Sequence, residues 1–262
     1  MADHQCGGCG GCGGGQVEAQ EPQKVQPNPL SKLKKTIGIV SGKGGTGKSL
    51  VTGLLAAGLQ RRSHDVGILD GDITCPAIPL MIDLPQGVTR GEAGLYPAIS
   101  ELGIRVMSIR LLMESEAELI TTRGASMAAI IEQLFSSVIW DDADYLFLDL
   151  PPGLGDVVQL GFERLPLDGL LVVTTPQELV AQTVRRTILL AQSLEVPVLG
   201  LVENFSESFP GHGTEMISQE FDLPILDRLP LDPRLSIAAD GGKLEVLETS
   251  YLSNTIQMLE SL

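Results

Sequence analysis

The sequence predicts an α/β fold in which helices flank a mostly parallel sheet. Short, uninterrupted apolar runs rich in β-branched residues recur along the chain, and segments with helical periodicity lie between several of them. Such runs are typical of strands that are buried on both faces of a sheet. The chain has 262 residues, of which 43% are hydrophobic, and this is enough for one large core. Ligands of such sheets bind at the carboxyl ends of the strands.

The first 30 residues differ from the rest of the chain. Three cysteines, Cys6, Cys9 and Cys12, are separated only by pairs of glycines, and a linker rich in Gln, Glu and Pro follows them. Neither part has apolar periodicity, so neither buries enough surface to offset the entropy of ordering it. We therefore predict a flexible tail over residues 1–30 and a single domain over residues 31–262.

The elements of the domain follow from its apolar pattern, taken in order. Strands are predicted at 36–40, 66–69, 104–108, 145–148, 170–174, 198–202 and 225–229. Helices are predicted at 47–63, 126–135, 179–194, 214–221 and 250–262. In the first of these helices Leu50, Leu54, Leu55 and Leu59 recur at helical spacing. Strands that alternate with helices predict parallel pairing through crossover connections.

The charge balance excludes several classes of partner. The chain carries 33 acidic and 18 basic residues, for a formal net charge of −15, and aromatic residues make up 4%. Nucleic-acid binding normally needs a basic surface and aromatic stacking platforms, so we expect no nucleic-acid partner. No apolar run approaches the length of a membrane helix, and the N-terminus lacks the pattern of a secretory signal. We expect a cytoplasmic protein with no membrane partner.

Residues 42–49 read GKGGTGKS and fit the phosphate-loop motif G-x-x-x-x-G-K-[ST]. The motif lies between a predicted strand and a predicted helix, which is the context that it requires. Glycines let backbone N–H groups turn toward phosphate oxygens, and the helix N-terminus adds a favourable dipole. Lys48 is predicted to bridge the β- and γ-phosphates, and the Ser49 hydroxyl to bind Mg²⁺. The predicted nucleotide-binding residues of this loop are Gly42, Lys43, Gly44, Gly45, Thr46, Gly47, Lys48 and Ser49, and the motif predicts a P-loop NTPase fold.

Aspartates follow two of the predicted strands. Asp149 comes at the end of one strand and is predicted to hold Mg²⁺, while Asp72 follows another and is predicted to orient the attacking water. Residues 151–153, Pro-Pro-Gly, make a stiff turn with a glycine pivot, which suits a switch that senses the γ-phosphate. Asp156 either belongs to this switch or caps the helix that follows.

The loop sequence KGGTGKS resembles the deviant Walker A motif of the MinD/ParA/nitrogenase-iron-protein class, which carries a second lysine at the position of Lys43. The resemblance implies that Lys43 reaches across an interface to the partner's nucleotide, in a homodimer that sandwiches two nucleotides. The predicted catalytic residues are then Lys43, Lys48, Asp72 and Asp149.

From about Lys34 nearly to its end, the chain is more closely similar to the Mrp/ApbC/Nbp-type iron–sulfur cluster carrier ATPases. The matching landmarks are the segments 70–76, 122–124, 140–156, 174–178, 202–204 and 229–233. The resemblance implies that Asn204, Pro230 and Asp232 contribute to the adenine pocket of ATP. It also implies slow ATP hydrolysis by a dimer that delivers an iron–sulfur cluster to apo-proteins.

One motif of that family is missing. Its members usually carry Cys-x-x-Cys after the asparagine strand, and the cysteines of two subunits hold a bridging cluster. Phe209 and His212 stand at these two positions. Phenylalanine binds no metal, and a lone histidine in a loop is more often solvated than a ligand. We therefore expect this central metal site to be absent.

The cysteines of the tail offer an alternative. Cys6, Cys9 and Cys12 have the spacing of the first three ligands of a bacterial [4Fe–4S] motif, and His4, a partner residue or a substrate could supply the fourth. The opposing interpretation is a disordered tail that is vulnerable to oxidation. The remaining cysteine, Cys75, lies in the loop after Asp72 and is expected to be a small buried thiol.

Three other functions compete with the cluster carrier. A positioning ATPase like MinD or ParA acts on membrane or DNA, but residues 250–262 contain no lysine or arginine and the net charge of −15 opposes DNA binding. An electron-delivering switch like the nitrogenase iron protein needs core cysteines that this chain lacks. A regulatory nucleotide switch without a metal cargo is the third alternative.

Overall fold

The computed structural model describes residues 23–113 and 124–262. Their strands form an eight-stranded sheet in the order β10-β9-β8-β1-β7-β2-β6-β5 and a two-stranded sheet of β3 and β4. The strands are β1 (Lys32–Ser41), β2 (Val66–Asp70), β3 (Thr89–Gly91), β4 (Gly94–Tyr96), β5 (Ala98–Ile99), β6 (Arg105–Ser108), β7 (Asp142–Asp149), β8 (Gly169–Thr174), β9 (Val198–Asn204) and β10 (Ile225–Leu229). Every pair in the large sheet is parallel except β5 with β6. The predicted α/β fold is confirmed.

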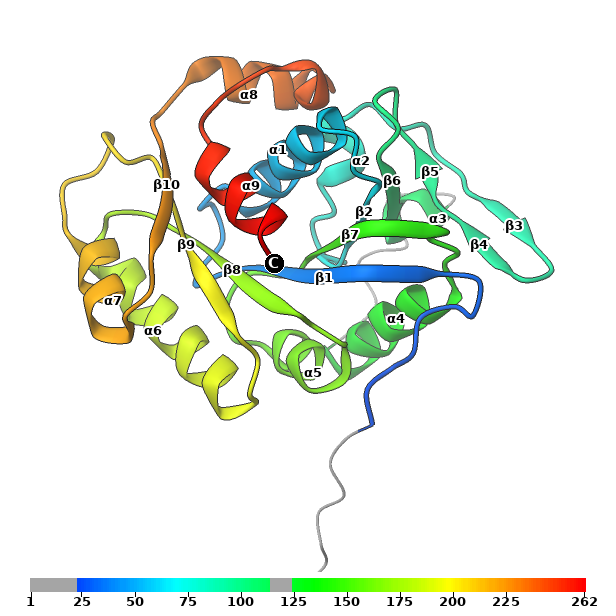
Figure 1. Cartoon of the computed structure of the whole chain (residues 1–262), viewed down its shortest axis with the longest axis horizontal. Helices are drawn as coiled ribbons and strands as arrows, with labels where there is room; N and C mark the ends of the chain where they lie inside the picture. The colour runs from blue at the N-terminus through cyan, green and yellow to red at the C-terminus, as the bar shows by residue number, and fades with distance from the viewer. Residues whose placement is uncertain (1–22, 114–123) are drawn as a thin grey trace, which may run out of the picture.

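Helices cover both faces of the sheet (Figure 1). They are α1 (Lys48–Arg61), α2 (Ile78–Met81), α3 (Ile109–Leu112), α4 (Gly124–Ser137), α5 (Asp156–Arg164), α6 (Glu178–Ser193), α7 (Gly213–Phe221), α8 (Pro233–Asp240), the 3₁₀ helix η2 (Leu244–Val246) and α9 (Ser253–Glu260). Helices α4 to α7 lie on one face, and α1, α8 and α9 lie on the other. Among these helices, none is both long and apolar enough to cross a bilayer.

Each face of the sheet has its own hydrophobic core. Along β7, Leu146 and Leu148 belong to the core under α4 to α6, whereas Tyr145 and Phe147 belong to the core under α1 and α9. Successive side chains of a strand point to opposite faces, so a strand covered on both faces needs apolar residues at every position. This explains the uninterrupted apolar runs in the sequence.

The register brings the ends of the central strands to one edge of the sheet. Asp149 on β7 is paired with Ile39 on β1 and with Asp70 on β2, and Asp70 is paired in turn with Ser108 on β6. The loop of residues 42–47 leaves β1 at the same edge. The fold therefore gathers the predicted phosphate loop and both aspartate-bearing strands in one place.

Some elements were not predicted. Helices α5 and α8 have nine and eight residues, and β3 and β4 have three residues each. Elements of this length give only a weak periodic pattern, although α7 and α9, with nine and eight residues, were predicted. The β3–β4 hairpin also lacks apolar alternation, since Thr89–Gly91 is exposed throughout.

Part of the predicted tail packs against the domain. The Asn28 side chain is 5% exposed and donates a hydrogen bond to the Ala93 carbonyl at 3.0 Å. The Ser31 hydroxyl donates to the Val138 carbonyl at 3.2 Å and accepts from the backbone N–H of Trp140 at 2.8 Å. The packed chain therefore begins before the predicted boundary at residue 31. Cys6, Cys9, Cys12, Thr122 and Arg123 lie outside the described residues.

Candidate functional site

The phosphate loop turns sharply between β1 and α1. Gly45 and Gly47 have positive φ values of 81° and 84°, a backbone region that favours glycine. A Cβ atom at Gly47 would also meet the Asn204 amide nitrogen, so a larger residue there would displace that side chain as well as strain the loop. Helix α1 begins directly afterwards at Lys48. Its first N–H groups and its dipole are therefore available to an anion held in the loop.

Asp149 is the centre of a compact polar cluster. Its side chain is fully buried, and Lys48 Nζ lies 2.8 Å from Oδ2 with only 6% of the lysine side chain exposed. The Ser49 hydroxyl donates to Oδ2 at 2.6 Å, and the Thr52 hydroxyl donates to Oδ1 at 2.7 Å. The structure thus brings together Lys48, Ser49 and Asp149, three of the residues that the sequence singled out.

The donor set of this cluster fits a nucleotide with Mg²⁺. Hydroxyl and carboxylate oxygens, as on Ser49 and Asp149, are the ligands that Mg²⁺ prefers. The Thr46 hydroxyl in the loop is buried and has no hydrogen-bond partner among the described residues. A buried donor of this kind normally has a partner, and a phosphate oxygen would supply one. Lys48 would then exchange its contact with Asp149 for the phosphates.

Asp70 is a second buried carboxyl next to this cluster. It is fully buried, and its Oδ2 accepts a hydrogen bond from the Ser108 hydroxyl at 3.1 Å. Burial is the largest cause that raises the pKa of Asp70, to about 8, and the neighbouring negative charge of Asp149 raises it further. Lys48 and Ser108 oppose this shift. The Asp70 carboxyl therefore keeps its proton to a higher pH than an exposed aspartate does.

Asp72 lies in the turn after β2 and is 9% exposed. Its Oδ1 accepts hydrogen bonds from the Thr74 hydroxyl at 2.8 Å and from the Cys75 N–H at 3.2 Å. Its own N–H donates to Asp70 Oδ1 at 3.2 Å, which ties this turn to the buried carboxyl. The Cys75 side chain is exposed, so the expectation of a buried thiol is wrong. The Asp72 turn holds the backbone N–H of Cys75 and leaves its thiol outside.

Lys43 does not point into the cluster. It is exposed, and its Nζ lies 3.3 Å from Gln177 Oε1, next to the start of α6. A cation presented in this way at the rim of the phosphate loop is free to contact another molecule.

The segment after β7 runs along the same rim. The Gly153 N–H donates to the Ser41 carbonyl at 2.9 Å, which holds the Pro-Pro-Gly turn against the end of β1. Helix α5 begins at Asp156, and its N-cap is Gly155 without a side-chain cap. Asp156 is exposed in the first helical turn, so the capping alternative is wrong.

Of the residues predicted to contribute to the adenine pocket, Asn204 lies at the phosphate loop. It is 1% exposed, and its Nδ2 donates to the Thr46 carbonyl at 2.9 Å. Asp232 caps α8, and its carboxylate accepts from Arg234 and from the Tyr251 hydroxyl at 3.0 Å. Its contribution to the adenine pocket stays a prediction. The Arg234 hydrogen bond is the largest cause that lowers the pKa of Asp232, to about 2. Pro230 is half-buried just before this cap, and its role stays a prediction.

Comparison with known proteins identifies the family. The model of the ParA family, described as NUBPL iron-transfer P-loop NTPase, matches residues 32–262. The chain belongs to this family.

Individual relatives agree with this membership. An iron-sulfur cluster carrier protein of Methanocaldococcus jannaschii is 37% identical, over 86% of this chain and 81% of its own length. A cytosolic Fe-S cluster assembly factor NUBP2 homolog of Culex quinquefasciatus is 35% identical, over 84% and 92%.

Solved structures agree as well. A nucleotide-binding protein of Archaeoglobus fulgidus in complex with ADP superposes with a TM-score of 0.72 at 33% identity, over 84% of this chain and 90% of that one. The cell division ATPase MinD of Pyrococcus furiosus shares the fold with a TM-score of 0.67 at 22% identity, over 87% and 97%. This chain is therefore a P-loop NTPase of the NUBPL iron-transfer family.

Phe209 and His212 stand at the two positions where cysteines of this family are expected, and they do not form a set of metal ligands. Phe209 is 40% exposed, and its ring meets the edge of Phe205 with centroids 6.1 Å apart. His212 is exposed at the N-cap of α7. No group of three or more His, Cys, Asp or Glu residues within 23–113 and 124–262 is placed to hold a metal ion. The tail cysteines fall outside those ranges.

Four residues of the site were not predicted. One is the buried Asp70, and the others are Thr52, Ser108 and Gln177, which hold Asp149, Asp70 and Lys43 respectively. Thr52 stands one helical turn after Lys48, and this spacing could have indicated it. Ser108 ends a predicted strand, as the two aspartates do. Gln177 carries no local signal, because its contact with Lys43 depends only on the fold.

Proposed function

We propose that this protein is an ATP-binding and ATP-hydrolysing carrier of an iron–sulfur cluster, or a maturation factor of a related metal centre, that works as a homodimer in the cytoplasm. The observation that carries the nucleotide part is the cluster of Lys48, Ser49, Thr52 and Asp149 beneath the phosphate loop. The carrier part is supported by the family and by relatives named as iron-sulfur cluster carriers and a cytosolic assembly factor. Its partners are apo-proteins that receive the cluster.

The chain's own residues account for slow hydrolysis. The loop N–H groups and Lys48 bind and orient the phosphates, and Ser49 and Asp149 hold Mg²⁺, which supplies positive charge to the phosphate oxygens. Asp72 orients the attacking water once it leaves its turn with Thr74 and Cys75. Because Asp72 is held in that turn, each turnover requires a local rearrangement, which is consistent with a slow ATPase.

The metal cargo is tested by anaerobic reconstitution with iron and sulfide. The three tail cysteines are the only thiols besides Cys75 in the chain. We expect the full chain to gain a visible chromophore with about four irons per chain or per dimer, as a [4Fe–4S] cluster requires. Replacement of Cys6, Cys9 and Cys12 by serine should abolish the chromophore.

Cys75→Ser is the matched control, since it removes an exposed thiol outside the tail. It should keep the full chromophore. A triple tail variant that retains the chromophore would show that the tail does not bind the cluster. A wild-type chain that hydrolyses ATP but binds no iron would favour the regulatory switch without a metal cargo.

The homodimer is tested through Lys43. With a non-hydrolysable ATP analogue, we expect wild-type protein to sediment as a dimer and Lys43→Ala to remain largely monomeric. The reason is that Lys43 is exposed at the rim of the nucleotide site and would neutralise phosphates across the interface. Lys32→Ala is the control, because Lys32 is 82% exposed at the start of β1, away from the phosphate loop. Equal sedimentation of both variants would refute the trans role of Lys43.

A further inference from the structure

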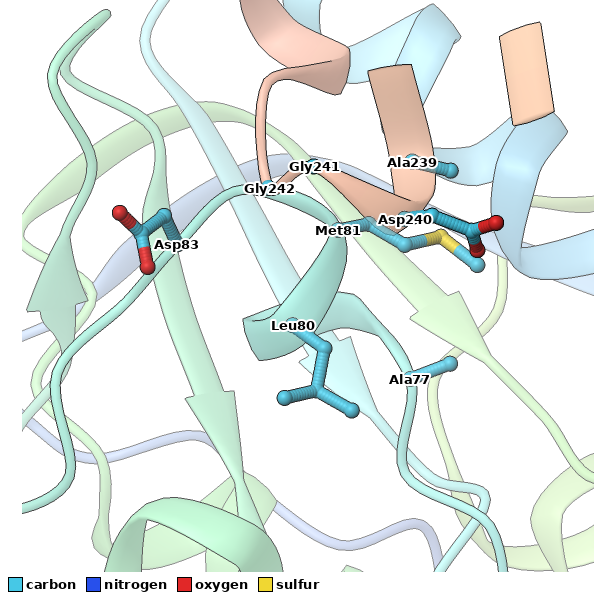
Figure 2. A pocket seen from close by; sticks show the side chains of 8 residues that line it. All are labelled: Ala77, Leu80, Met81, Asp83, Ala239, Asp240, Gly241 and Gly242. Carbon is cyan, nitrogen blue, oxygen red and sulfur yellow. The ribbon is translucent and has the colours of Figure 1, made fainter. Parts of the chain in front are cut away.

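A hollow of about 670 Å³ lies between α2 and the end of α8, outside the nucleotide site (Figure 2). Leu80, Met81 and Asp83 line one wall, and Asp240, Gly241 and Gly242 line the other. The two walls meet closely at Gly242, which has a φ of 68° and whose Cβ would lie 2.8 Å from the Asp83 Cβ. The hollow is therefore a fixed feature of two packed elements, because the close approach at Gly242 sets the distance between its walls.

Large aliphatic side chains are exposed in and beside this hollow. Leu80 is 54% exposed, and in an adjoining hollow of about 570 Å³ Ile237 and Val246 are 70% and 61% exposed. Gly241 lines both hollows, so the two adjoin at this residue. Exposed apolar surface that gathers in one region is typical of interaction sites.

The carboxylates around Leu80 form no ion pair with any of the described residues. In Figure 2, Asp83 and Asp240 stand on opposite sides of Leu80. Neither carboxylate has a hydrogen bond or ion pair within the described part of the chain. The same holds for Glu101, which lines a neighbouring hollow together with Asp83. Lys243 rims that neighbouring hollow and, together with Arg234, the adjoining hollow of Ile237 and Val246, but neither cation lines the hollow between α2 and α8. The environment of Leu80 is therefore apolar at its centre and acidic on two sides.

We propose that this surface, defined by Leu80, Met81, Asp83 and Asp240, docks a segment of a partner protein that presents an apolar side chain flanked by lysine or arginine. Charge complementarity selects this occupant. The chain has a net charge of −15, so a second copy or a nucleic acid would bring further negative charge to the two unpaired carboxylates. A basic segment pairs with both carboxylates and buries its apolar side chain against Leu80 and Met81. The proposal goes beyond the proposed function, since it uses neither the nucleotide nor the metal.

The test uses a fluorescein-labelled, alanine-based helical peptide with two leucines, each flanked by lysines one turn away. Fluorescence anisotropy with the full-length protein should show saturable binding that weakens with added salt. Leu80→Ser should weaken binding about tenfold, because the leucine no longer buries the peptide's apolar side chain. The double variant Asp83→Asn/Asp240→Asn should weaken binding by a similar factor and lower its salt dependence.

Asp222→Asn/Glu195→Gln is the matched control, because it removes two exposed carboxylates on loops elsewhere. It should change the affinity less than twofold, and thermal melting should show that all variants are folded. Equal weakening by the control would show non-specific attraction to an acidic chain and would overturn the proposal. No saturable binding below about 100 µM would also overturn it. A change of sedimentation with Leu80→Ser would instead assign the surface to a second copy and would overturn the proposal. Lys48→Ala should bind the peptide as the wild type does, because the surface lies outside the nucleotide site, so a failure of the nucleotide site is told apart from a failure of this proposal.

Discussion

Replacement of Lys48 with alanine is expected to reduce ATP turnover at least about a thousandfold. The ammonium group is buried at the phosphate loop, 2.8 Å from Asp149, and no other lysine approaches this cluster among the described residues. Its positive charge would lie next to the phosphates and stabilise the transition state, in which negative charge moves between them. Turnover is measured as phosphate release under saturating Mg²⁺ and ATP.

The same replacement should also destabilise the nucleotide-free protein, by about 3 kcal/mol, because the buried Asp149 loses its cation. The double variant Lys48→Ala/Asp149→Asn should recover most of this loss in the free energy of unfolding, while turnover stays at the level of Lys48→Ala. Lys48→Met, which keeps most of the side-chain volume, should be as inactive as Lys48→Ala. A Lys48→Met protein with more than a tenth of wild-type turnover would contradict the assignment of the phosphate loop.

Asp70 should make the stability of the nucleotide-free protein fall as pH rises from about 4 to about 8. Its pKa in the folded protein is raised to about 8 from 3.8, chiefly by burial, so the folded state binds the proton more tightly than the unfolded chain. The stabilising contribution is complete below the unfolded pKa and is lost as pH rises through the folded pKa. A tenfold difference in proton affinity corresponds to about 1.4 kcal/mol, so the total contribution amounts to several kcal/mol.

The measurement is the free energy of unfolding of wild type and Asp70→Asn from denaturant titrations between about pH 5 and 9. The difference between the two proteins should grow with pH in favour of Asp70→Asn, because the amide cannot ionise. Asp222→Asn is the control, since Asp222 is exposed at the end of α7 in a left-handed conformation that asparagine also adopts. Parallel curves for wild type and Asp70→Asn would show that Asp70 does not carry a raised pKa.

The local features of this protein could be predicted because they are determined by residues that are contiguous in the sequence. Strand β10 coincides with the predicted range, and α1 and α6 fall within two residues of theirs at each end. The phosphate loop is eight consecutive residues, and the geometry that it needs follows from its own glycines. The helix pattern did not show α5 and α8, although it did show α7 and α9, which have the same lengths, so length alone does not explain the two omissions.

The contacts between distant segments could not be predicted in this way. The pairing of Asp149 with Asp70 depends on the register of the sheet. The contacts of Ser108 with Asp70 and of Thr52 with Asp149 depend on how β6 and α1 pack. Burial decides the chemistry of such groups, because an aspartate inside the protein ionises at a different pH from the same residue in water. For the same reason Cys75 looked like a buried thiol in sequence and is exposed in the fold.

The sequence by itself thus determined the fold class, the phosphate loop and the loss of the Cys-x-x-Cys pair at Phe209 and His212, because each is encoded by neighbouring residues. Only the tertiary structure decided which carboxyls are buried together, where Lys43 points, and that Leu80 lies exposed between Asp83 and Asp240. These properties arise from side chains that are far apart in the chain, and the electrostatic and apolar environment of each exists only once the elements have packed.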